Sequence, residues 1–204
     1  KPRSARPGAR AAGAVRLGAA APRRERFHGF KGMVHFLHTA DWQIGRQYGQ
    51  LDPEDGALLA QARFDAVQAI AALAARQRVD AVLVAGDVFD MQDVSDRTVR
   101  RLFQLLEGFA GPWVMIAGNH DAALSAGVWT RARQLGCIPA NVHVPAAPQV
   151  VELADAGLAV LAAPLTRRHT YDDVTEPFDR MASAPGLVRV GLAHGSVTGR
   201  LPDT

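Results

Sequence analysis

Three apolar runs separated by helical patterns constrain the fold of this chain more than any other feature. The runs at 34–39, 79–85 and 113–117 each have the length and composition of a buried strand. Between them, 53–78 and 95–107 repeat apolar residues near the period of a helix. Strands that alternate with helices at this spacing predict right-handed βαβ units and a mainly parallel sheet. We therefore expect an α/β fold.

The pattern weakens after residue 117, but it still predicts short elements. A short helix is expected at 128–135 and a helical segment at 172–182. We expect strands at 142–144, 149–153, 158–163 and 187–193, with a turn at 155–157. The sequence shows no internal repeat and no linker to a second folded domain.

Four of the predicted strands end in residues that can bind a metal ion. These residues are Asp41 with Gln43, then Asp87, then Asn119 with His120, and finally His194. Open α/β sheets place their functional sites at the carboxyl ends of the strands. Carboxylates, amide oxygens and imidazoles suit divalent ions such as manganese, iron or zinc. Two such ions can polarise a phosphodiester and activate water for its hydrolysis.

Each of these residues also has a structural interpretation when it is taken alone. Asp41 can cap a turn, and Asp87 follows a glycine as turn residues often do. Asn119 and Asp121 can cap the element that follows, and His194 can be a hydrogen-bonded structural histidine. The coincidence of four strand ends favours the metal site over these separate interpretations.

The motifs resemble those of the calcineurin-like metallophosphoesterases. Gly118-Asn119-His120-Asp121 matches a motif of that superfamily. His38-Thr39-Ala40-Asp41-Trp42 and Gly86-Asp87-Val88-Phe89-Asp90 look like the SbcD-type DNA repair exonucleases within it. The resemblance covers about residues 33–198. It implies an α/β sandwich with central, mainly parallel sheets flanked by helices.

The resemblance also implies a set of metal ligands, which bind two divalent ions that we expect to be Mn²⁺. Asp41 corresponds to a ligand of the first metal, and Gln43 stands where the family has a histidine ligand. Asp87 corresponds to the ligand shared by both metals, which are bridged by the hydroxide nucleophile. Asn119 and His194 correspond to ligands of the second metal.

Two catalytic roles follow from the same resemblance. His120 would lie beside the scissile phosphate and stabilise the transition state or protonate the leaving oxygen. Asp121 would orient His120 through a hydrogen bond to its other ring nitrogen.

The sequence departs from the family pattern in two places. Gln43 is a weaker donor than imidazole for these ions, which puts the affinity of the first metal site in question. The closing Gly-His-x-His motif of the family, which supplies one ligand to each metal, does not follow His194. We therefore expect the 204 residues to be a fragment whose site is incomplete.

The positive charge of the chain is concentrated in residues 1–32. This segment holds nine of the 23 basic residues and one of the 20 acidic residues, so the rest of the chain is mildly acidic. Its Arg, Ala, Gly and Pro composition predicts a disordered extension, either a basic arm for nucleic acid or sequence upstream of a true start at Met33. We favour the second interpretation, and it makes 33–204 the metallophosphoesterase domain.

Three functions remain open at the level of the sequence. The first is a metal-dependent DNA exonuclease or endonuclease of repair and recombination, which the resemblance pairs with an SbcC-like coiled-coil ATPase and a homodimer. The second is a phosphodiesterase for cyclic nucleotides or other small phosphodiesters, which the acidic balance of 33–204 favours. The third is a catalytically impaired binding module, which Gln43 suggests. The single cysteine and the lack of a long continuous apolar run lead us to expect a cytoplasmic protein without membrane contact.

Overall fold

The computed structural model describes residues 33–196, and the expectations for 1–32 lie outside this range. Its helices are α1 (Pro53–Gln77), α2 (Asp96–Leu106), α3 (Val128–Gln134) and the 3₁₀ segments η1 (Ala154–Ala156) and η2 (Glu176–Arg180). Its strands are β1 (Phe36–Thr39), β2 (Ala81–Ala85), β3 (Trp113–Ile116), β4 (Val142–His143), β5 (Gln149–Leu153), β6 (Leu158–Ala163) and β7 (Val188–Ala193).

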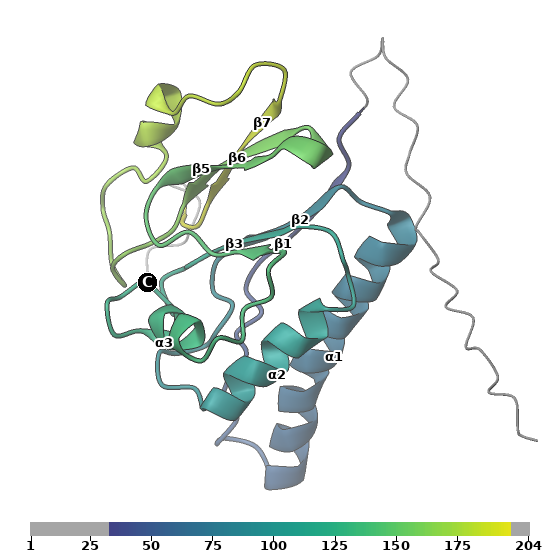
Figure 1. Ribbon diagram of the computed structural model, residues 1–204. Coiled ribbons are helices and arrows are strands. Elements are labelled where there is room, and N and C mark those ends of the chain that lie inside the picture. The colour runs from purple at the N-terminus through teal and green to yellow at the C-terminus, as the bar shows by residue number, and fades with distance from the viewer. Residues whose placement is uncertain (1–32, 197–204) are drawn as a thin grey trace, which may run out of the picture. The chain divides into compact units, whose positions relative to one another are not determined.

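The strands form two sheets that pack face to face (Figure 1). The first sheet has the order β1-β2-β3-β4, and all of its pairs are parallel. The second has the order β5-β6-β7, in which β5 pairs antiparallel and β7 parallel with β6. Helices α1 and α2 cover the other face of the first sheet (Figure 1). The expected α/β fold with a mainly parallel sheet is confirmed.

Successive side chains along the strands of the first sheet point to opposite faces, so the sheet contributes to two hydrophobic cores. Val82 and Val84 of β2 face the helices, where they pack in a cluster with Trp113 and Phe103. The intervening Leu83 faces the second sheet. A strand that is buried on both faces reads as a continuous apolar run, which is why β2 and β3 were predictable from sequence.

Local sequence sets the ends of the two long helices. Pro53 occupies the first turn of α1, and the helix ends at Arg78 in a left-handed conformation with φ 50°. Ser95 caps α2, because its side-chain oxygen accepts a hydrogen bond from the backbone N–H of Thr98 at 3.2 Å. Each helix therefore begins and ends close to the predicted residue.

Two expectations about the fold were wrong in detail. The first strand is not buried: β1 lies at the edge of its sheet, and Phe36 is 40% exposed. The helical segment expected at 172–182 is only the short η2, because its polar composition offers little apolar surface to pack. On α1, which shows the predicted helical pattern, the buried residues begin at Phe64, and Leu58 and Leu59 nearer its N-terminus are exposed.

Within the described residues, α1 is the one helix that is long and apolar enough to cross a membrane. Length and composition alone are weak grounds for such a span. Phe64, Val67, Ala71 and Ala74 of α1 are buried against the first sheet. Burial of one face in this way is typical of an amphipathic helix on the surface of a globular domain.

Candidate metal centre

The loops that follow β1 and β2 are held together by backbone hydrogen bonds. The N–H of Asp41 donates to the carbonyl of Gly86 at 3.1 Å, and the N–H of Gln43 donates to the carbonyl of Asp87 at 2.9 Å. Ile44 continues the pairing by donating to Val88 at 2.8 Å. The parallel register of β1 and β2 therefore extends past the strand ends and places Asp41 beside Asp87.

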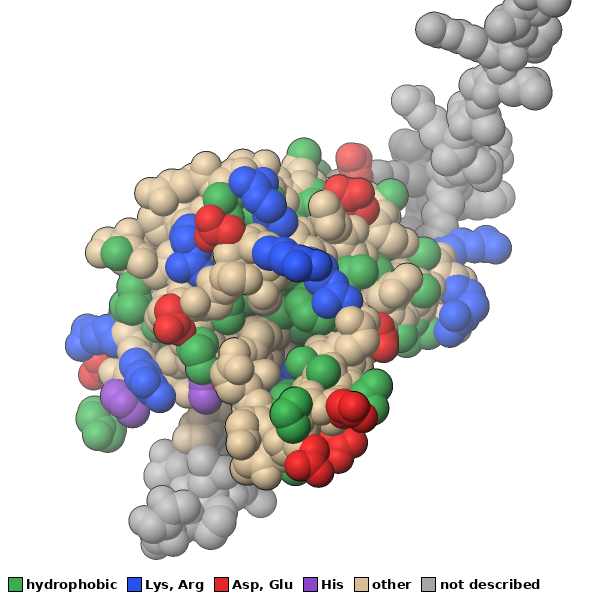
Figure 2. Space-filling model, turned by 90° about the horizontal axis from the view of Figure 1, so that it is seen from below, with side chains coloured by type: hydrophobic (Ala, Val, Ile, Leu, Met, Phe, Trp, Pro, Cys, Tyr) green, Lys and Arg blue, Asp and Glu red, His purple; other side chains and the backbone are tan. Residues whose placement is uncertain are grey.

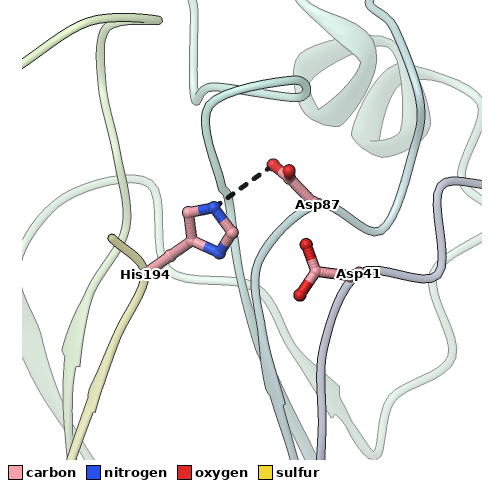
Figure 3. Close-up of side chains that lie close together, drawn as sticks. All are labelled: Asp41, Asp87 and His194. Carbon is pink, nitrogen blue, oxygen red and sulfur yellow. Dashed lines mark ion pairs between the residues drawn. The ribbon is translucent and has the colours of Figure 1, made fainter. Parts of the chain in front are cut away.

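Three of the predicted ligands meet at this edge. Ligand atoms of Asp41, Asp87 and His194 all lie within 4.8 Å of one another, although the residues follow three different strands, β1, β2 and β7 (Figure 3). Asp87 is 3% exposed, and its Oδ1 lies 3.6 Å from Nε2 of His194. Two carboxylates and an imidazole that converge in this way form a donor set for a divalent cation.

Asn119 joins the same cluster through His194. Nδ1 of His194 lies 2.7 Å from the carbonyl oxygen of Ala85, so Nδ1 carries the proton and donates to it. This tautomer leaves a lone pair on Nε2, which faces Oδ1 of Asn119 at 2.9 Å. Two acceptors that face each other require a cation or a proton between them. The residues present therefore fit a bound metal ion, with a backbone carbonyl orienting the histidine ligand as is usual in metal sites.

The backbone around the cluster adopts conformations that side chains rarely take. Asp41, Gln43 and Asp87 have φ values of 56°, 45° and 50°. Left-handed residues of this kind cost free energy and cluster at functional sites. A Cβ on Gly118 would overlap the Asp87 carboxylate and lie 2.5 Å from the Asp87 nitrogen. Gly118 is therefore required so that β3 can approach Asp87.

His120 is positioned by a main-chain oxygen. Its Nδ1 lies 2.8 Å from the carbonyl of Asp90, and its Nε2 lies 4.0 Å from Oδ2 of Asp87. The backbone N–H of His120 also donates to Oδ1 of Asp87 at 3.0 Å. The side chain is 33% exposed.

Asp121 does not have the hydrogen bond that we expected. Its carboxylate makes no hydrogen bond to the ring of His120, whose Nδ1 instead pairs with the carbonyl of Asp90. Its Oδ1 accepts from the N–H of Gly118 at 2.7 Å, and its Oδ2 accepts from Val88 at 2.9 Å and Phe89 at 3.1 Å. The expectation failed because three backbone donors surround this fully buried carboxylate. Asp121 instead ties the loop after β2 to the loop after β3.

The environment of Asp121 also changes its acidity. Burial is the largest effect and, together with the charge of Asp87, raises its pKa from 3.8 to about 6. The hydrogen bonds from Gly118, Phe89 and Val88 act in the opposite direction but do not compensate for the burial.

Gln43 lies next to the cluster with its amide oxygen already engaged. Nη1 of Arg46 donates to Oε1 of Gln43 at 2.6 Å. The backbone of Gln43 is fixed to Asp87, as described above, so its position in the loop matches that of a ligand. A guanidinium on the ligand oxygen weakens it further as a donor to a cation.

Sequence reasoning missed two parts of this region. The carbonyl of Asp90 has no side-chain signature, so no pattern identifies it. The loop after β6 was also missed, although Arg167, Arg168 and His169 form a basic run in the sequence. This loop and the metal cluster line one open cavity of about 600 Å³.

The chain is similar in sequence to several known proteins. The SbcD subunit of nuclease SbcCD from Rhodobacter capsulatus is 37% identical over 97 residues, which are 44% of this chain and 22% of that protein. DNA double-strand break repair protein Mre11 of Sulfurisphaera tokodaii is 31% identical over 94 residues, 44% of this chain and 22% of that protein. The uncharacterized metallophosphoesterase YhaO of Bacillus subtilis is 25% identical over 175 residues, 80% of this chain and 41% of that protein.

These alignments span between about a fifth and two fifths of the relatives' own length. Residues 34–195 match the calcineurin-like phosphoesterase family, a range that contains every strand end described above. The chain therefore belongs to the calcineurin-like phosphoesterase family.

Proposed function

We propose that this chain is the nuclease domain of a metal-dependent DNA exonuclease or endonuclease that acts in repair and recombination. The observation that carries the proposal is the convergence of Asp41, Asp87 and His194, with Asn119 against His194, at the carboxyl edge of the sheets. Two of the relatives are named as nuclease or DNA break repair proteins. Their similarity lies within a family whose chemistry is phosphoester hydrolysis.

In this proposal the ligands divide between two metal ions, for which Mn²⁺ is our choice. Asp41 and the neighbouring Gln43 serve the first ion, Asp87 serves both, and Asn119 with His194 serves the second. When bound, such ions supply Lewis acidity toward the phosphodiester and activate water. The buried position of Asp87 suits the shared role, since a carboxylate that is 3% exposed is held in one place by its surroundings.

His120 has the position of the side chain that acts on the substrate. Its Nδ1 is held by the carbonyl of Asp90, and its Nε2 lies on the side of Asp87. From there it can stabilise charge on the phosphate or give a proton to the leaving oxygen. Asp121 positions these groups without touching the substrate, because its three hydrogen bonds fix the loops that carry Asp87 and His120.

The relatives also suggest partners for the complete protein. The Rhodobacter capsulatus relative is by its name one component of a larger nuclease, SbcCD. We therefore propose an SbcC-like coiled-coil ATPase as the partner and a cytoplasmic location. We further propose a homodimer in which a second copy covers the exposed Leu58 and Leu59 of α1.

Degradation of linear DNA by the purified full-length protein with Mn²⁺ tests the proposal. Asn119→Ala and His120→Ala should each abolish it, and activity that survives both changes would contradict the proposal. Hydrolysis of bis-p-nitrophenyl phosphate or cyclic AMP without attack on DNA would favour a small phosphodiester as substrate. A protein that binds at most one metal ion, and that Gln43→His does not rescue, would favour a binding module.

A further inference from the structure

The loop after β6 lines the same cavity as the metal cluster. Arg168 and Tyr171 of this loop share the lining with Asp41, Asn119 and His194. Figure 2 shows Arg, His and hydrophobic side chains gathered at the left edge of one face of the molecule. We call residues 166–171 the basic wall.

The base of this wall is fixed to the strand end that carries Asn119. The N–H of Leu165 donates to the carbonyl of Ala117 at 3.0 Å, just before Gly118. The carbonyl of Leu165 accepts from the N–H of Ala123 at 2.7 Å, just after Asp121. Leu165, just before the basic wall, is therefore hydrogen-bonded to residues on both sides of the segment that supplies Asn119 and His120. These bonds fix the start of the wall relative to the metal cluster.

The charged and aromatic side chains of the wall have no partners within the described residues 33–196, and only the Thr170 hydroxyl accepts a hydrogen bond there, from the N–H of Asp172 at 3.3 Å. Arg167, Arg168 and His169 make no hydrogen bond or ion pair there, and Tyr171 is 102% exposed without a ring contact. The carboxylates closest in sequence do not neutralise the arginines through ion pairs. Asp173, for example, accepts from the N–H and the hydroxyl of Thr175 in its own turn.

Unpaired guanidinium groups and an exposed aromatic ring are the features that bind a single nucleic-acid strand. Arginine contacts phosphates, and an aromatic ring stacks on a base of any sequence. Only an unpaired base offers its face to such a ring, because bases in a duplex stack on each other. A mononucleotide at the metal cluster would leave the wall without a function, whereas a strand that continues past the cluster would use it.

We propose that the basic wall binds the unpaired strand that leads to the metal centre, with Tyr171 stacking on a base and Arg168 contacting a phosphate. This inference rests on the proposed nuclease function and narrows its substrate to single-stranded nucleic acid or a frayed duplex end. In this inference, Tyr171 and Arg168 determine how the strand binds and do not touch the reacting atoms.

Binding of a short single-stranded DNA, measured by fluorescence anisotropy in EDTA so that no strand is cut, tests this role. Tyr171→Ala should weaken binding about 5- to 100-fold, and Tyr171→Phe should restore it, because stacking needs the ring and not the hydroxyl. Arg168→Ala should make the dependence of log K on log salt shallower by about 0.7, the value for one phosphate contact.

The matched control is Arg76→Ala. Arg76 lies at the C-terminal end of α1, just before β2 begins, and so near the end of the sheet opposite to the metal cluster. It should bind like the wild type with an unchanged salt dependence. If Tyr171→Ala and Arg168→Ala also bind like the wild type while the wild type degrades DNA, the wall inference is wrong and the nuclease function stands. If the wild type hydrolyses bis-p-nitrophenyl phosphate but neither binds nor cuts DNA, both proposals are wrong.

Discussion

Replacement of Asp121 by asparagine tests two properties of this buried carboxylate, its hydrogen bonds and its charge. The substitution removes the charge but keeps one oxygen acceptor and nearly the same shape. The remaining oxygen can serve Val88 and Phe89, which leaves the N–H of Gly118 facing an amide donor. A buried donor without an acceptor costs about 1–3 kcal/mol of the free energy of unfolding.

The charge of Asp121 adds a dependence on pH. Its pKa is raised from 3.8 to about 6 in the folded protein, so the folded state binds more protons than the unfolded state between these values. Stability from this group is present at low pH and is lost as pH rises through about 6. From pH 4 to pH 7 the loss amounts to about 2 kcal/mol, at about 1.4 kcal/mol per pKa unit.

Urea unfolding of the metal-free protein in EDTA at several pH values measures both effects. The wild type should be more stable than Asp121→Asn at pH 4, and this advantage should shrink by about 2 kcal/mol by pH 7. Asp93→Asn, at an exposed aspartate, controls for the loss of one carboxylate. An advantage that stays constant or grows as pH rises would refute the reasoning, because it would show that burial does not dominate at Asp121.

Three further predictions concern the metal loops and the surface of α1. Gly118→Ala should cost about 1–3 kcal/mol in urea unfolding, because the new methyl group displaces Asp87, and it should weaken Mn²⁺ binding in calorimetry; unchanged binding would show that Asp87 is not a ligand. Gln43→His should lower the dissociation constant for Mn²⁺, and no change would place residue 43 outside the site. Leu58→Asp should convert the proposed dimer to monomer in light scattering with less than about 0.5 kcal/mol change in monomer stability, whereas a persisting dimer would place the interface elsewhere.

The sequence predicts the fold well where the direction of the strands alone decides which residues meet. The carboxyl ends of parallel strands meet at one edge, so apolar runs that end in Asp87 and Asn119 were enough to predict their proximity. Prediction was less successful where packing between elements decides the outcome. The exposure of Leu58 depends on how far α1 extends beyond the sheet, and the edge position of β1 depends on strand order.

The details of the site show the same limit. Residue types indicated that a histidine and two aspartates serve a metal, but they did not indicate which atoms orient them. The carbonyl of Asp90 holds His120, whereas Asp121 is engaged by three backbone donors. Backbone partners of this kind have no residue-type signature, so only the fold reveals them.

The central claim is that the strand ends form a metal centre in which Asp87 is the shared ligand. Calorimetric titration of Mn²⁺ into the metal-free full-length protein tests this claim most directly, with Asp87→Asn compared with Asp93→Asn. Asp87→Asn keeps an oxygen that can accept from the N–H of His120, so its fold should persist. Our account predicts that it loses more than about tenfold in affinity while Asp93→Asn binds like the wild type. Equal affinity of Asp87→Asn and the wild type would contradict it.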